Sequence, residues 1–183
     1  MGLTEELAAA AVAAQAHAGA GETVGAILVA EPQPRERTYL CAYDGATGRS
    51  WLALDADGRP VTDRNRVRAA VSIAALCEVA EDQAGGGELE ELRRSLVTLR
   101  LTESPPGIEE AETAALELET AIGAPPRVAS AAYLDEVAAA TRRLEVALGS
   151  EGESPFTVAL QQAVGAVEEL AREVEAEYKL PLT

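Results

Sequence analysis

The sequence has few of the side chains on which common catalytic and metal sites depend. Its 183 residues include one histidine, two cysteines and six aromatic residues, namely one Trp, one Phe and four Tyr. A single histidine excludes His-rich zinc and di-iron sites, and no Gly-x-Ser-x-Gly pattern accompanies His17 as a Ser–His–Asp triad would need. The only lysine, Lys179, lies outside any Gly-rich phosphate-binding motif. We therefore expect no catalytic residue, no resident metal and no cofactor.

Positive charge is also scarce in this chain. Fifteen Lys and Arg residues face 31 Asp and Glu residues, so the formal net charge is −16. Because basic side chains on phosphates supply most of the affinity for nucleic acids, this composition argues against a nucleic-acid partner. No apolar run reaches the roughly 18 residues of a membrane span, and the N-terminus lacks the basic and apolar regions of a signal peptide. We expect a cytoplasmic protein that does not bind membranes.

The first 62 residues show one helical pattern followed by several strand patterns. Thr4 precedes two glutamates and an Ala-rich run, which predicts a helix that reaches about Ala18. Runs rich in β-branched and aromatic residues follow, separated by turns rich in Gly, Pro and Asp. These runs cover residues 24–30, 38–43 and 50–55. The order predicts a helix and then a three-stranded antiparallel meander.

From residue 63 onward, apolar residues recur at every third or fourth position, as in amphipathic helices. Gly- and Pro-rich loops divide this part into five expected helices, at residues 63–84, 89–103, 108–122, 134–148 and 154–178. We expect a mostly helical α+β protein, in which the N-terminal helix and three-stranded antiparallel sheet pack on a C-terminal antiparallel bundle of about five helices. The helix and meander module takes residues 1–62 and the bundle residues 63–183, together one continuous structural unit. Residues 178–183 form a short apolar tail that should fray, with packing back on the bundle or use as a contact peptide as the alternatives.

Half of the aromatic residues lie on one predicted hairpin. Tyr39 and Tyr43 alternate onto one face of a strand, and Trp51 stands in the next strand. A four-residue loop would pair Tyr43 with Ser50 and separate Trp51 from the tyrosines, whereas a five-residue loop would unite the three rings, and the sequence does not choose between them. Aromatic side chains are enriched at protein interfaces. Tyr39, Tyr43 and Trp51 are therefore the predicted interaction surface, with burial under the first helix and the bundle as the alternative.

Four arginines are clustered around the start of the helix expected from residue 63. They are Arg59, Arg64, Arg66 and Arg68. Guanidinium groups beside the free N–H groups of a helix start would suit a phosphate or a carboxylate, so these residues form a candidate anion-binding site. The competing interpretation is a set of surface ion pairs with nearby acidic residues. Those acidic residues are Asp55, Asp57 and Asp63.

Acidic residues recur at helical spacing in the second half of the chain. Carboxylates three or four positions apart share a helix face and could hold Mg²⁺, but a solvated acidic face explains the same pattern. We therefore expect a non-enzymatic interaction, accessory or adaptor protein that acts through the aromatic hairpin or a bundle face, with a protein partner or as a homodimer. The alternative is a small-molecule or nucleotide-binding enzyme, in which the arginine cluster clamps an anion and helix carboxylates bind Mg²⁺.

Overall fold

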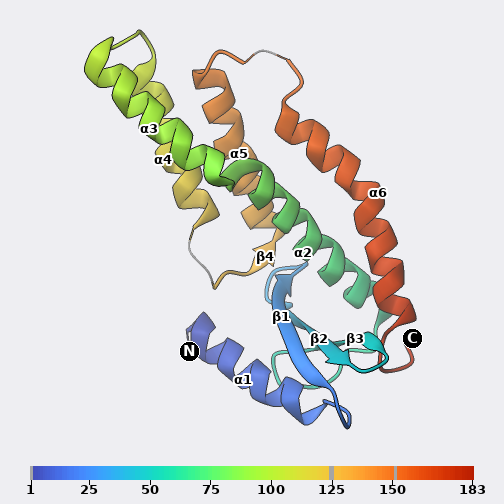
Figure 1. Ribbon diagram of the computed structural model, residues 1–183. Coiled ribbons are helices and arrows are strands. Elements are labelled where there is room, and N and C mark those ends of the chain that lie inside the picture. Colours follow the sequence, from blue (N-terminus) through green and yellow to red (C-terminus); the bar gives the residue numbers. More distant parts are fainter. Residues whose placement is uncertain (1, 124–125, 151) are drawn as a thin grey trace. The chain divides into compact units, whose positions relative to one another are not determined.

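The computed structural model describes residues 2–123, 126–150 and 152–183 (Figure 1). Within these residues, the chain forms six helices and four strands, which confirms the α+β class. The helices are α1 (Leu3–Ala16), α2 (Arg64–Gly85), α3 (Gly87–Thr102), α4 (Ile108–Ile122), α5 (Ala131–Ala147) and α6 (Pro155–Ala176). The strands are β1 (Thr23–Glu31), β2 (Thr38–Gly45), β3 (Gly48–Leu54) and β4 (Ala129–Ser130). None of the described helices is long and apolar enough to cross a bilayer.

The sheet is mixed, in the order β3-β2-β1-β4. The antiparallel meander of β1, β2 and β3 is confirmed, but the description of the sheet as three-stranded was incomplete, because the short β4 adds parallel pairing at Ala30 and Glu31. Only two residues of β4 pair, too few to leave an alternating pattern in the sequence. The loop between β2 and β3 is shorter than expected, since Gly45 pairs with Gly48.

One face of the sheet is covered by α1. Tyr39, Cys41 and Tyr43 of β2 pack there with Leu54 of β3 and with Ala14 of the helix. Small alanine side chains let the helix approach the rings closely, so a chain with few large apolar residues still buries this face. Cys41 is a free, buried thiol, and burial raises its pKa to about 11.

The opposite face of the sheet packs against the beginning of α2 and the end of α6. Leu40 and Ala53 of the sheet share this core with Val67 of α2 and Val174 of α6. Asp63 precedes α2, and its Oδ1 accepts hydrogen bonds from the backbone N–H groups of Asn65 and Arg66 at 2.8 and 3.2 Å. The helix start expected at this aspartate is therefore confirmed.

A second core lies among the helices of the middle of the chain. Leu118 of α4, Val137 of α5 and Phe156 of α6 are buried in it, together with several alanines. The helices α3 and α4 run antiparallel, because Arg93 pairs with Glu119 and Arg100 with Glu112. The expected helical bundle is thus matched in part.

The chain divides into two compact units. Unit 1 is Met1–Ala75, Pro125–Ala131 and Gly165–Thr183, and unit 2 is Leu76–Ala124 and Ala132–Val164. This division follows spatial contacts along the chain. The helices α2 and α6 each begin in one unit and end in the other.

Candidate interaction surface

The register of the hairpin decides where its aromatic residues lie. Tyr43 pairs with Ser50, and Trp51 pairs with Ala42. Of the two registers open from the sequence, the structure has the one that places Trp51 on the face opposite to Tyr39 and Tyr43. The three aromatic rings therefore do not form one surface.

The two tyrosines of the predicted interaction surface lie in the core. Tyr39 is 3% exposed and Tyr43 is fully buried. The hydroxyl of Tyr43 donates to the carbonyl of Ala14 at 2.9 Å, and the hydroxyl of Tyr39 lies 3.3 Å from Oε2 of Glu6. Burial raises the pKa of both phenols. In this conformation the rings support α1, as in the alternative interpretation.

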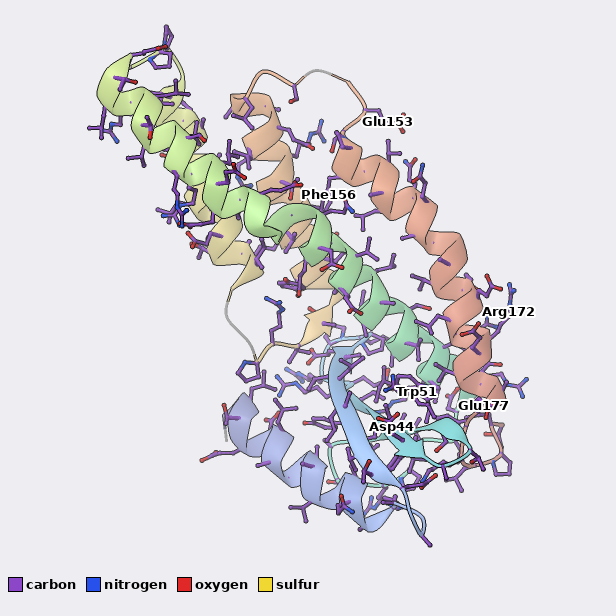
Figure 2. The ribbon with its side chains drawn as sticks, in the orientation of Figure 1. Asp44, Trp51, Glu153, Phe156, Arg172 and Glu177 are labelled. Atoms are coloured by element: carbon purple, nitrogen blue, oxygen red, sulfur yellow. The ribbon has the colours of Figure 1, made fainter. Side chains whose placement is uncertain are left out.

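Trp51 is half-buried, and the segment that follows α6 lies beside it (Figure 2). The N–H of Trp51 donates to the carbonyl of Glu177, and the N–H of Lys179 donates to the carbonyl of Trp51, both at 3.0 Å. Farther along, Thr183 exchanges backbone hydrogen bonds with Thr62 and Arg64. Fraying, the default expectation for residues 178–183, was therefore wrong: main-chain hydrogen bonds hold the segment to β3 at Trp51 and to Thr62 and Arg64 at its end, and sequence composition does not encode them.

The single lysine anchors this C-terminal segment. Nζ of Lys179 lies 3.8 Å from the centroid of the Tyr43 ring and donates to the carbonyl of His17 at 3.0 Å. It also forms an ion pair with Glu22. The hydrogen bond from Lys179 lowers the pKa of Glu22 below its usual value. The scarcity of lysine excludes lysine-dependent chemistry, and the one lysine present makes a structural contact that the sequence does not indicate.

Replacing Lys179 with Met should lower the melting temperature and remove part of the acid sensitivity of the fold. Because the folded state lowers the pKa of Glu22, its stabilising effect is complete above the ordinary value of 4.5 and is lost as the pH falls through the lowered value. Melting curves between about pH 7 and pH 3 measure this slope. The exposed Arg172→Met variant, which loses the same charge, is the control; equal acid slopes in both variants would contradict the assignment.

The four clustered arginines do not converge on one site, although Arg64 and Arg68 both reach Glu175. Arg59 pairs with Asp57 at 3.2 Å, and Arg64 lies 3.7 Å from Glu175. The partner of Arg59 agrees with the ion-pair interpretation, whereas Arg64 reaches an acidic residue of α6 that the sequence could not place nearby. Surface pairs of this kind contribute little to stability individually.

The other two arginines of the cluster connect elements of unit 1. The guanidinium of Arg66 donates to Oγ1 of Thr38 and to the carbonyl of Arg37 at 3.0 and 2.9 Å. Arg68 contacts Glu168 at 2.9 Å and Glu175 at 3.2 Å. Every arginine of the cluster is thus engaged within the chain. Among the described residues, no group of three or more His, Cys, Asp or Glu side chains could hold a metal ion.

The outer edge of β1 is the most open part of the sheet. In the described residues, the strand neighbour on that side is β4, which pairs only with Ala30 and Glu31. Figure 1 shows β1 with β2 and β3 on its other side. Gly25, Ala26 and Leu28 are exposed, Leu28 to 43%. Alternate residues of such a strand direct their N–H and C=O groups away from β2, where another strand can accept them.

This edge also lacks two of the features that keep sheet edges from pairing. The stretch from Thr23 to Ala30 has no charged residue and no proline. Its one irregularity is a register shift between Val24 and Ala26. Gly25 occupies that point, where an added Cβ would clash with the carboxylate of Asp44. The sequence predicts this strand, but it does not predict that the strand has an open edge, because that depends on where β4 pairs.

Comparison with known proteins finds no matching family model, no matching curated protein and no matching solved structure. The placement of the chain's own residues is therefore the basis for a functional proposal. Of the features described above, the tyrosines face inward and the clustered arginines have partners within the chain. The edge of β1 remains open.

Proposed function

We propose that this chain is a non-enzymatic interaction protein that self-associates through the open edge of β1. The observation that carries the proposal is an uncharged, apolar edge strand with exposed residues, which among the described residues pairs with β2 on one side and has no strand on the outer side of Thr23–Leu28. Edges of this kind bind another strand through main-chain hydrogen bonds. This proposal keeps the interaction role expected from the sequence. It assigns that role to the edge of β1 instead of the aromatic hairpin.

A second copy of the chain fits this edge better than a charged segment does. Ile27 faces the α1 side of the sheet with its partner Cys41, whereas Ala26 and Leu28 face the other side. An antiparallel pairing about a two-fold axis at Ile27 would place Ala26 of one copy beside Leu28 of the other, on the same face. Such a surface is self-complementary, as a two-fold interface must be.

The acidic residues that bracket the edge do not oppose this pairing. Glu22 is paired with Lys179 at one end, and Glu31 is paired with Arg37 at the other, at 3.1 Å. The pairing partner therefore meets neutralised carboxylates. The net charge of −16 on each copy still acts at longer range, so added salt should strengthen the association by screening it.

The test compares the solution mass of three proteins by light scattering. The wild-type chain should form dimers, and the double variant A26K/L28K should be monomeric, because lysines on an edge strand disfavour edge-to-edge pairing. The control A8K/V12K adds the same charge on exposed positions of α1, where Val12 is 74% exposed. It should remain dimeric.

Hydrogen exchange supplies a second measurement on the same samples. Backbone amides of Thr23–Leu28 should become more protected as the wild-type concentration rises, and those of β3 should not change. A wild-type chain that stays monomeric at high micromolar concentration would overturn the proposal. So would a dimer that survives in A26K/L28K.

A further inference from the structure

A cleft in unit 1 lies apart from the open stretch of β1, adjoins the arginine cluster at Asp57, the partner of Arg59, and is lined by three segments. They are one side of α1, the loop between β1 and β2, and the turn that follows β3. Its volume is about 490 Å³, within the range of small-molecule sites. Ala9, Ala10 and Ala13 form an apolar wall of the cleft. Gly58 closes the turn against α1, since a Cβ there would lie 2.9 Å from that of Ala13.

The polar side of the cleft is built around Arg37. Its guanidinium pairs with both Glu6 and Glu31, and the half-buried Glu6 also lies within reach of the Tyr39 hydroxyl. These contacts fix the positions of two carboxylates and raise the pKa of Arg37, although its burial acts in the opposite direction. Oε2 of Glu6 takes part in these contacts, while its Oε1 has no hydrogen-bond donor among the described residues.

Arg35 occupies a backbone conformation that arginine rarely adopts. The N–H of Glu36 donates to the carbonyl of Gln33, which closes a β-turn with Pro34 and Arg35 at its centre. Arg35 has a φ of +69°, the left-handed region. With proline second, the third position of such a turn favours Gly or Asn, and other residues are strained there. A strained residue that lines a cleft suggests a requirement for its side chain.

The guanidinium of Arg35 is available for a ligand. Its backbone N–H is held by Glu31 at 3.1 Å, but its exposed side chain has no ion-pair or hydrogen-bond partner in the described part of the chain. It differs in this respect from the four clustered arginines, all of which are engaged. The cleft therefore presents one free cation and, at Glu6, Asp55 and Asp57, carboxylate oxygens without a donor among the described residues.

We propose that this cleft binds a small zwitterion, a molecule with a carboxylate at one end and an ammonium group at the other. The carboxylate pairs with Arg35, the ammonium group pairs with Glu6, and the aliphatic part lies on the alanines of α1. A simple anion would meet four lining carboxylates against two guanidiniums, namely those of Glu6, Glu31, Asp55 and Asp57 against Arg35 and Arg37. A simple cation would leave Arg35 without a partner. The two ligand groups of the protein come from different segments, the β1–β2 loop and α1.

The test measures binding by calorimetry with matched probes. The ω-amino acids 4-aminobutanoate, 5-aminopentanoate and 6-aminohexanoate carry both charges, whereas pentanoate and pentylamine carry one each. At least one ω-amino acid should bind the wild-type chain roughly two- to fivefold more tightly than either singly charged probe, because an ion pair to an exposed side chain contributes up to about 1 kcal/mol. Equal binding of pentanoate or pentylamine would overturn the proposal.

Two variants and their controls locate the site. Arg35→Asn should abolish zwitterion binding and at the same time raise the melting temperature by a few degrees, since Asn suits the left-handed conformation. Arg172→Gln, an exposed arginine outside the cleft, should change neither. Ala9→Phe should fill the cleft and block binding, while Ala8→Phe, exposed on the same helix but outside the cleft lining, should bind normally. Retained binding in Arg35→Asn or Ala9→Phe would overturn the assignment.

Discussion

Replacing Tyr178 with Phe should lower the free energy of unfolding by about 3 kcal/mol. The Tyr178 hydroxyl donates to the carbonyl of Val61 at 2.8 Å and accepts the N–H of Ala53 at 2.7 Å. Both backbone groups would lose their partner in a largely buried place, and each unsatisfied group costs roughly 1–3 kcal/mol. Urea unfolding monitored by circular dichroism measures the loss.

Tyr39→Phe is the matched control, because its hydroxyl makes one long contact of 3.3 Å to Glu6. Its loss should be below about 1 kcal/mol. Alkaline unfolding provides a second readout, since burial raises the pKa of Tyr178 to about 12 from its ordinary 10.0. The stabilisation is complete below the ordinary pKa and is lost as the pH rises to about 12. Equal losses in the two variants, or an unchanged alkaline transition in Tyr178→Phe, would contradict this role.

Replacing Leu118 with Ala should cost about 3 kcal/mol of the free energy of unfolding, within the range known for buried leucines. Leu118 is 2% exposed in the core of unit 2, where α4 and α5 pack around Val137. The smaller side chain leaves a cavity that the alanine-rich surroundings cannot fill by changing rotamer. Chemical denaturation of the full chain gives the value.

Leu116 lies two positions earlier on the same helix and is 53% exposed. Leu116→Ala removes the same side-chain atoms as Leu118→Ala but with little loss of packing. Alanine is also at least as good a helix former as leucine. Its effect should stay within about 0.5 kcal/mol. If the two variants lost equal stability, the core assigned to unit 2 would be wrong.

The local elements of this fold were predictable from the sequence, because each has its own periodic pattern. The three meander strands and the helices appear close to their expected ranges, and the aspartate before α2 serves as its cap as expected. Strand β4 was missed since two residues have no detectable period. The place of the C-terminal segment was also missed, because it depends on main-chain hydrogen bonds between Trp51 and Lys179, distant in sequence.

The candidate sites were harder to predict than the fold. Tyr39 and Tyr43 were correctly recognised as sharing one strand face, but which face α1 covers depends on tertiary packing. The arginine cluster was visible as composition, whereas the acidic partners of Arg64 and Arg68 lie in α6, about one hundred residues later. The role of Arg35 was not predictable from the sequence, because its positive φ arises from the turn that it forms with Pro34.

The division of unit 1 over three chain segments has a consequence for synthesis on the ribosome. All of unit 2 precedes Gly165, so its residues are translated before unit 1 is complete. Ala53 and Tyr178 are 125 positions apart, which at ordinary translation rates leaves the outer edge of β3 without its partner for on the order of ten seconds. Unit 1 begins to emerge first, and we therefore expect it to finish folding last. During this interval β3 is open to mispairing.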